Sequence, residues 1–170
     1  MTADWRSEGV RVVPPDALDD RTPQTPGMHR AAAVGARTGA TGLWAGTVVI
    51  EPDARTGAHS HGELESVIYV VSGRARMRWG DRLEFTAEAG PGAFVFVPAH
   101  VPHQEENASA TEPLHCVVTR SGLDPVVIDL ELDGVVDEPE QVAWVDPSHP
   151  GARHRAVTSP PSTRSATPVT

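Results

Sequence analysis

The chain has 170 residues, a formal net charge of −9 at neutral pH, and aromatic residues at only 5% of its positions. This length suits one domain with a core of Val, Leu, Ile and Ala. The acidic balance argues against nucleic acid or an anionic membrane as a partner, because phosphate contacts need a basic face.

Two residue types narrow the chemistry further. All 14 basic residues are Arg, so mechanisms that use a lysine amine are excluded. Cys116 is the only cysteine, so no internal disulfide can form, and a small buried hydrophobe is its simplest role. No secretion signal and no run of 18 apolar residues is visible, so we expect a cytoplasmic protein.

Residues 1–27 are expected to form an irregular N-terminal arm. They hold one short strand-like run, Val10–Val13, and then a stretch rich in Pro and Asp. Pro and Asp in this density interrupt both helices and strands. This segment is therefore predicted to precede the folded barrel as an arm.

Residues 28–132 have the pattern of about ten short strands separated by turns that contain Gly and Pro. The alternation is clearest in Arg74–Trp79, where three Arg side chains share one face and apolar side chains share the other. The run Ala93–Val97 is apolar on both faces, as in a strand covered on each side. With no helical period before residue 135, the pattern favours a β-sandwich or barrel.

A first group of metal-capable side chains stands just ahead of the strand-like run Val67–Val71. His59 and His61 alternate and therefore share one face of an extended strand. Glu65 keeps this parity if the strand is regular, and Glu63 is the rival carboxylate. Imidazole and carboxylate together favour a transition metal over Ca or Mg.

A second group follows an apolar strand that ends at Pro98. After a tight turn, His103 opens the next stretch and would supply a third imidazole if the two strand pairs lie side by side in a barrel. The expected metal ligands are thus His59, His61, Glu65 and His103. The alternative is that these side chains only make ordinary hydrogen bonds.

The first segment resembles the first signature motif of the cupin superfamily. His59, His61 and Glu65 have the family's spacing. Seven residues, where the family has six, separate Glu65 from Gly73, and Asp53 stands at the position of the family's leading Gly.

The second segment resembles the second cupin motif. His100 replaces one Gly of that motif. The positions that match are Gly92, Pro98, His103 and Asn107. The resemblance covers residues 40–130.

The resemblance implies an all-β double-stranded β-helix, or jelly-roll barrel, over residues 28–132. It also implies one divalent transition metal, with Fe(II) favoured and Mn, Ni, Cu, Co or Zn as alternatives. Arms such as residues 1–27 can pack on a second subunit, so a homodimer is expected.

Three functions agree with this resemblance. The leading hypothesis is an Fe(II)-dependent dioxygenase or oxygenase that acts on a small organic molecule. The alternatives are a non-redox isomerase, lyase or cyclase, and a non-catalytic cupin that binds a ligand or assists another enzyme. No helix-turn-helix segment accompanies the barrel, which argues against a transcription factor.

Three further side chains are candidates for catalysis. His100 lies in the turn before His103 and could carry a proton near neutral pH, or be merely exposed. Tyr69 and Gln104 could hydrogen-bond a substrate, with core packing and solvent exposure as their respective alternatives.

The chain changes character after the barrel. Residues 133–146 are expected to be a peripheral segment, with a short helix or strand on the outside of the barrel. Residues 147–170 contain few hydrophobic residues and many Pro, Ser and Thr, and are expected to be a disordered tail.

Overall fold

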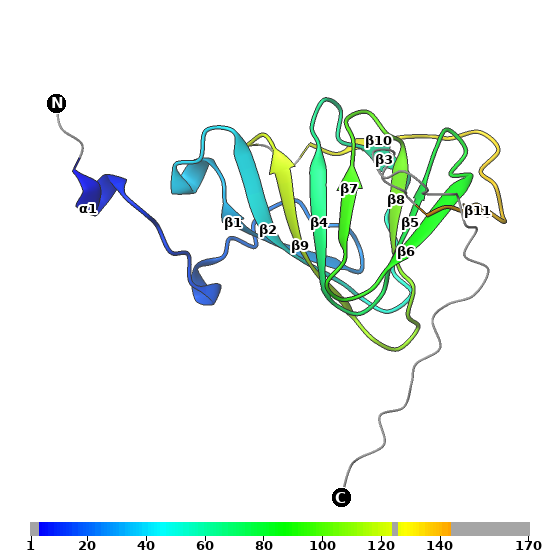
Figure 1. Ribbon diagram of the computed structural model, residues 1–170, viewed down its shortest axis with the longest axis horizontal. Coiled ribbons are helices and arrows are strands. Elements are labelled where there is room, and N and C mark those ends of the chain that lie inside the picture. The colour runs from blue at the N-terminus through cyan, green and yellow to red at the C-terminus, as the bar shows by residue number, and fades with distance from the viewer. Residues whose placement is uncertain (1–3, 124–125, 144–170) are drawn as a thin grey trace, which may run out of the picture.

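Two β-sheets face each other in the computed structural model of the chain, which describes residues 4–123 and 126–143 (Figure 1). The predicted all-β class is confirmed, and the sheets are built from strands that are distant in sequence. Within the described residues, no helix has the length and apolar character needed to cross a membrane.

The first sheet has five strands, and every neighbouring pair in it is antiparallel. Its longest strands pair along their whole length, from Leu43 opposite Ser121 to Ile50 opposite Leu114. In spatial order the strands are β1 (Met28–Val34), β2 (Leu43–Ile50), β9 (Leu114–Ser121), β4 (Ser66–Ser72) and β7 (Phe94–Val97).

The second sheet has six strands and carries the short segments on which the site depends. Its centre is a regular antiparallel set in which Trp79 lies opposite His103 on one side and Phe85 on the other. In spatial order the strands are β10 (Ile128–Asp129), β3 (His59–Ser60), β8 (His103–Asn107), β5 (Ala75–Trp79), β6 (Phe85–Ala89) and β11 (Glu140–Gln141).

The core lies between the inward faces of the two sheets. Alternate residues of β2 and β9 are buried, as expected when one face of an antiparallel sheet packs on a core and the other meets water. The buried apolar cluster consists of Met28, Trp44, Val48, Ile50, Ile68, Val70, Ala75, Met77, Val97, Leu114, Cys116 and Val118.

The N-terminal arm begins away from the barrel and ends on it (Figure 1). Its first part contains a short helix, α1 (Trp5–Glu8), and a 3₁₀ turn, η1 (Pro15–Ala17). The predicted strand Val10–Val13 is not formed. Further along, Asp19 and Ala32 exchange two backbone hydrogen bonds of 2.8 Å, which extends the sheet beyond β1.

A side chain holds the end of the arm against β1. The Gln24 side-chain oxygen accepts from the Arg30 N–H at 2.7 Å, and its nitrogen donates to the Arg30 carbonyl at 2.8 Å. The amide thus replaces a strand partner for Arg30. Residues 23–25 are fixed next to the first sheet as a result.

The departures from the cupin motifs have a structural explanation. The extra residue before Gly73 is taken up by a shift of register between Val70 and Ser72, which is a β-bulge. Asp53 and His100, which replace glycines, have φ angles of 57° and 64°. The backbone therefore keeps the left-handed shape that glycine would adopt, at an energetic cost.

The peripheral segment contributes the strand β11, which pairs in parallel with β6. A second 3₁₀ turn, η2 (Ala36–Thr38), links β1 to β2. The predicted disordered tail, residues 147–170, lies outside the described residues.

Candidate metal centre

Three imidazoles gather between β3 and β8. His59 lies directly opposite His103 in the antiparallel pair, and His61 follows β3 immediately. The ring centroids of His59 and His103 are 4.3 Å apart, and that of His61 lies 5.1 Å from His59 and 4.9 Å from His103. All three residues are at most 3% exposed.

The outer nitrogen of each imidazole is hydrogen-bonded to a backbone carbonyl. Nδ1 of His59 is 3.0 Å from the Gly57 oxygen, and Nδ1 of His103 is 2.9 Å from the Val101 oxygen. Nδ1 of His61 is 2.8 Å from the Val126 oxygen. A carbonyl can only accept, so each Nδ1 carries the proton and each Nε2 presents a lone pair.

A carboxylate completes the cluster, and it comes from Glu105. Two residues beyond His103 on β8, Glu105 projects to the same side of the strand. The ligand atoms of His59, His61, His103 and Glu105 all lie within 4.8 Å of one another. Glu105 is half-buried as a whole residue, and its ligand atom lies buried in the cluster.

These four side chains fit a transition-metal ion. Within the described part of the chain, Nε2 of His103 is buried and has no hydrogen-bond partner, which is costly unless something binds there. Ligands on opposite sides of an ion with bonds of about 2.1 Å lie about 4 Å apart, close to the spread observed here. Three imidazole nitrogens and one carboxylate suit Fe, Mn, Co, Ni, Cu or Zn.

The structure does not bring Glu65 into this cluster. Glu65 is exposed at the start of β4, where its N–H donates to Ser121 Oγ at 2.9 Å. The prediction assumed one regular strand from His59 onward, but a turn at Gly62, with φ of 58°, separates β3 from β4 and resets the parity. Glu63 is exposed as well.

Besides Glu105, sequence reasoning missed Arg120, a charged residue that contacts one of the imidazoles. It lies at the end of β9, is 6% exposed, and its Nη2 is 3.3 Å from Nε2 of His61. The sequence could have indicated that Arg120 is buried, because it continues the alternating inward-facing series of Leu114, Cys116 and Val118. An arginine on a buried face of a strand is rare without a specific role.

The pKa values of the site follow from burial and from this cation. Burial, and then the charge of Arg120, lower the pKa of His61 to about 3. Burial, and then His59, lower the pKa of His103. Burial acts to raise the pKa of Glu105, but the positive charge that His59 and His103 carry when protonated, together with that of Arg120, outweighs burial and leaves this pKa low. Neutral imidazoles and an ionised carboxylate are the forms that bind metal.

The three candidate catalytic residues lie outside the cluster. Tyr69 is on the outer face of β4, 36% exposed, and packs against Phe94 with ring centroids 4.8 Å apart. Gln104 is buried rather than solvent-exposed, and donates to the Thr56 carbonyl at 2.7 Å. His100 is exposed in its turn, where its N–H donates to the Gly62 carbonyl at 2.7 Å.

Comparison with known proteins places this geometry in a family. Residues 46–120 match the family described as Cupin domain. Residues 46–120, which are a little under half of the chain, are thus identified as a cupin domain. No curated protein matches the sequence.

Solved structures share the fold. The polyketide cyclase RemF from Streptomyces resistomycificus is similar with a TM-score of 0.56 and 23% identity, over 68% of this chain and 79% of RemF. Oxalate decarboxylase from Bacillus subtilis is similar with a TM-score of 0.54 and 23% identity, over 63% of this chain. The match spans only 28% of the oxalate decarboxylase chain. At these identities the similarity concerns the fold alone.

Proposed function

We propose that this cupin is a metal-dependent enzyme that acts on a small organic molecule, with the ion held by His59, His61, His103 and Glu105. The observation that carries the proposal is the common orientation of the imidazoles. All three protonated nitrogens point outward to carbonyls, and all three lone pairs point inward to one place. A divalent ion bound there can polarise a substrate oxygen, activate water or, if it is iron, support chemistry with dioxygen.

A cavity that is linked to the imidazoles through Arg120 supports catalysis over a purely structural metal. Four side chains leave a face of a five- or six-coordinate ion open, whereas structural zinc sites close their shell. A cavity of about 210 Å³ reaches Arg120, which in turn contacts His61. This volume is below the range of about 300–1,000 Å³ that is usual for larger ligands, so a small substrate is favoured.

The first candidate reaction is an Fe(II)-dependent oxygenation. It is supported by the donor set, because neutral nitrogen ligands with one carboxylate and an open face suit iron that reacts with dioxygen. Trp44, Val48 and Val118 give the cavity apolar walls that would hold an organic substrate away from water. Glu105 balances part of the charge of the ion.

The second candidate is a non-redox isomerase, lyase or cyclase reaction. The observation that favours it is Arg120, whose buried positive charge next to His61 would stabilise an anion that develops on the substrate. RemF, which is described as a polyketide cyclase, shares this fold, and so does an oxalate decarboxylase. Their shared fold does not assign either particular reaction to this chain.

One experiment separates the two reactions. Protein purified without air or chelator is analysed for its metal content, and portions are then loaded with Fe(II) or Zn(II). Each form is incubated with a panel of small organic acids and enols while oxygen uptake and product formation are followed. Oxygen uptake only with iron supports the oxygenase, and equal turnover with zinc in the absence of oxygen supports the non-redox reaction.

Two variants are needed as controls. His59→Ala should lose metal and turnover together, while His115→Ala, on the outer face of β9, should keep both. Tight metal binding with no turnover of any compound would instead favour the non-catalytic, helper role.

A further inference from the structure

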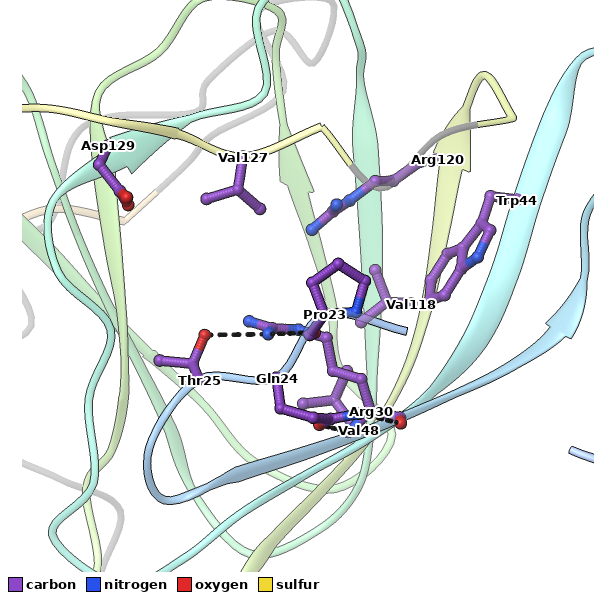
Figure 2. A pocket seen from close by; sticks show the side chains of 10 residues that line it. All are labelled: Pro23, Gln24, Thr25, Arg30, Trp44, Val48, Val118, Arg120, Val127 and Asp129. Atoms are coloured by element: carbon purple, nitrogen blue, oxygen red, sulfur yellow. Dashed lines mark hydrogen bonds between the residues drawn. The ribbon is translucent and has the colours of Figure 1, made fainter. Parts of the chain in front are cut away.

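Two arginines that form no salt bridge with any described residue, Arg30 and Arg120, line the cavity described above. Its walls come from the end of the arm, from β1, β2 and β9, and from the segment around β10 (Figure 2). Figure 2 shows the Arg120 side chain pointing from β9 into this space, with Arg30 and Thr25 on the opposite wall. Among residues 4–123 and 126–143, neither arginine has a carboxylate oxygen within 4.0 Å.

Of the two arginines, Arg120 gives the stronger evidence for a bound anion. It is more than nine-tenths buried, and its Nε has no hydrogen-bond partner among the described residues. Its Nη1 lies 3.5 Å from the Val126 carbonyl, and its Nη2 contacts an imidazole nitrogen at 3.3 Å. The charge of Glu105 acts on Arg120 from beyond 4.0 Å, but the direct contacts of the guanidinium are long and neutral. An anion that reached its Nε would therefore stabilise the buried charge.

Arg30 is held in place but keeps donors available. Its Nη1 donates to Thr25 Oγ1 at 3.0 Å, and its Nη2 is 3.7 Å from the Met28 sulfur. Gln24 fixes the backbone of Arg30, and Thr25 holds its guanidinium on one wall of the cavity. The cavity thus has one permanent positive charge from Arg120 and another from Arg30 on the opposite wall.

The remaining walls indicate what kind of anion would fit. Trp44, Val48, Val118 and Val127 are apolar and would contact a carbon skeleton. Asp129 is exposed at the rim and would repel a ligand with two negative charges. A planar carboxylate matches the two-pronged donor geometry of a guanidinium.

We infer that Arg120 binds the carboxylate of a small organic acid, and that this acid is the substrate of the metal centre. The inference rests on the proposed function, since it names the substrate class of the same site. Arg120 and an ion cannot both use the Nε2 lone pair of His61. Nε of Arg120 has no hydrogen-bond partner among the described residues, so it is available to a carboxylate with or without an ion at the imidazoles.

The test measures anion preference in metal-free protein, so it does not depend on turnover. Benzoate and benzamide have nearly the same shape and differ in charge, and their affinities are compared by calorimetry. We expect benzoate to bind about tenfold more tightly or better, and to shift the Trp44 indole resonance. Equal affinity, or no binding of benzoate at millimolar concentration, would overturn the inference.

Two variants assign the preference to Arg120. Arg120→Gln should reduce the ratio of the two affinities to about twofold or less, whereas Arg120→Lys should retain part of it. The matched control is Arg74→Gln, because Arg74 is exposed and pairs with Glu88 at 3.5 Å away from the cavity. An unchanged ratio in Arg120→Gln would refute the assignment.

The inference can still be tested if Arg120→Gln does not fold. The comparison of the two ligands in the wild-type protein and in Arg120→Lys then carries the test. Metal binding is measured separately, so loss of the metal centre and loss of anion preference are distinguishable results.

Discussion

Nη2 of Arg120 donates toward Nε2 of His61, the atom that would otherwise face a metal ion, across 3.3 Å. The imidazole lone pair is therefore partly used by a cation of the same chain. A positive charge at this distance also opposes the binding of a second one. A metal ion would consequently compete with Arg120 for Nε2 of His61.

The affinity for metal should rise when Arg120 loses its charge. We expect Arg120→Gln to bind Co(II) or Zn(II) about tenfold more tightly, a gain of about 1.4 kcal/mol. Competition with a chromophoric chelator measures this affinity. Arg120→Lys should fall between the two, and weaker binding by Arg120→Gln would show that the guanidinium assists the ion.

Two glutamate variants show whether Glu105 or Glu65 supplies the carboxylate ligand of the metal centre. Glu105→Gln keeps the shape of the side chain and removes its charge, and should lower metal affinity about 10–100-fold. Glu65→Gln should change it by less than about twofold, because Glu65 is exposed outside the cluster. The same competition assay applies, and the reverse order of the two effects would restore Glu65 as the ligand.

The only thiol should be unreactive in the folded protein. Burial, and then the charge of Glu105, raise the pKa of Cys116 to about 12, while an unfolded thiol titrates near its ordinary value. A thiol reagent at pH 8 should therefore react in urea but not in buffer. Rapid reaction without urea would contradict this prediction.

The same pKa shift has a consequence for alkaline stability. Between the ordinary pKa of a thiol and about 12, the unfolded chain releases a proton that the folded chain retains, so the free energy of unfolding falls as pH rises. Below that window the thiol is protonated in both states and contributes no slope. Urea titrations at several alkaline pH values should show a shallower decline for Cys116→Ala.

The turn at His100 should gain stability from glycine. With φ of 64°, His100 occupies a backbone conformation that L-residues disfavour. His100→Gly should raise the free energy of unfolding by about 0.5–1 kcal/mol, after the larger entropy of glycine in the unfolded chain is subtracted. Chemical denaturation measures the change, and His100→Ala should show no such gain.

Full turnover in His100→Ala would also exclude the acid-base role.

The homodimer expected from the sequence remains a prediction. Trp5, Val10 and Val12 are 76%, 99% and 86% exposed on an arm that extends from the barrel (Figure 1). On the outer face of the first sheet, Phe94 and Phe96 are 72% and 58% exposed, and the arm of a second copy would cover them. Sedimentation at micromolar concentration should show a dimer that Val10→Asp with Val12→Asp dissociates, and Ser7→Asp does not.

The sequence predicted the three imidazoles because their spacing and strand order decide their position. It gave Glu65 as the carboxylate from the family's spacing and an assumed regular strand, whereas the cluster contains Glu105 and a turn at Gly62 precedes β4. Glu105 could have been found by counting two residues from His103 along β8, without reference to any family. Arg120 could have been found in the same way, as the charged member of an otherwise apolar inward face. The cavity was not predictable, because the arm that closes it is held by Gln24 through a contact that no pattern indicates.

The pairing of His59 with His103 also determines when a metal centre can exist. These two residues lie on neighbouring strands that are separated in sequence by β4 to β7, which belong to both sheets. A fragment that contained either motif alone would present at most two imidazoles. Metal uptake during refolding should therefore report the pairing of β3 with β8, and its kinetics would give the rate of that step.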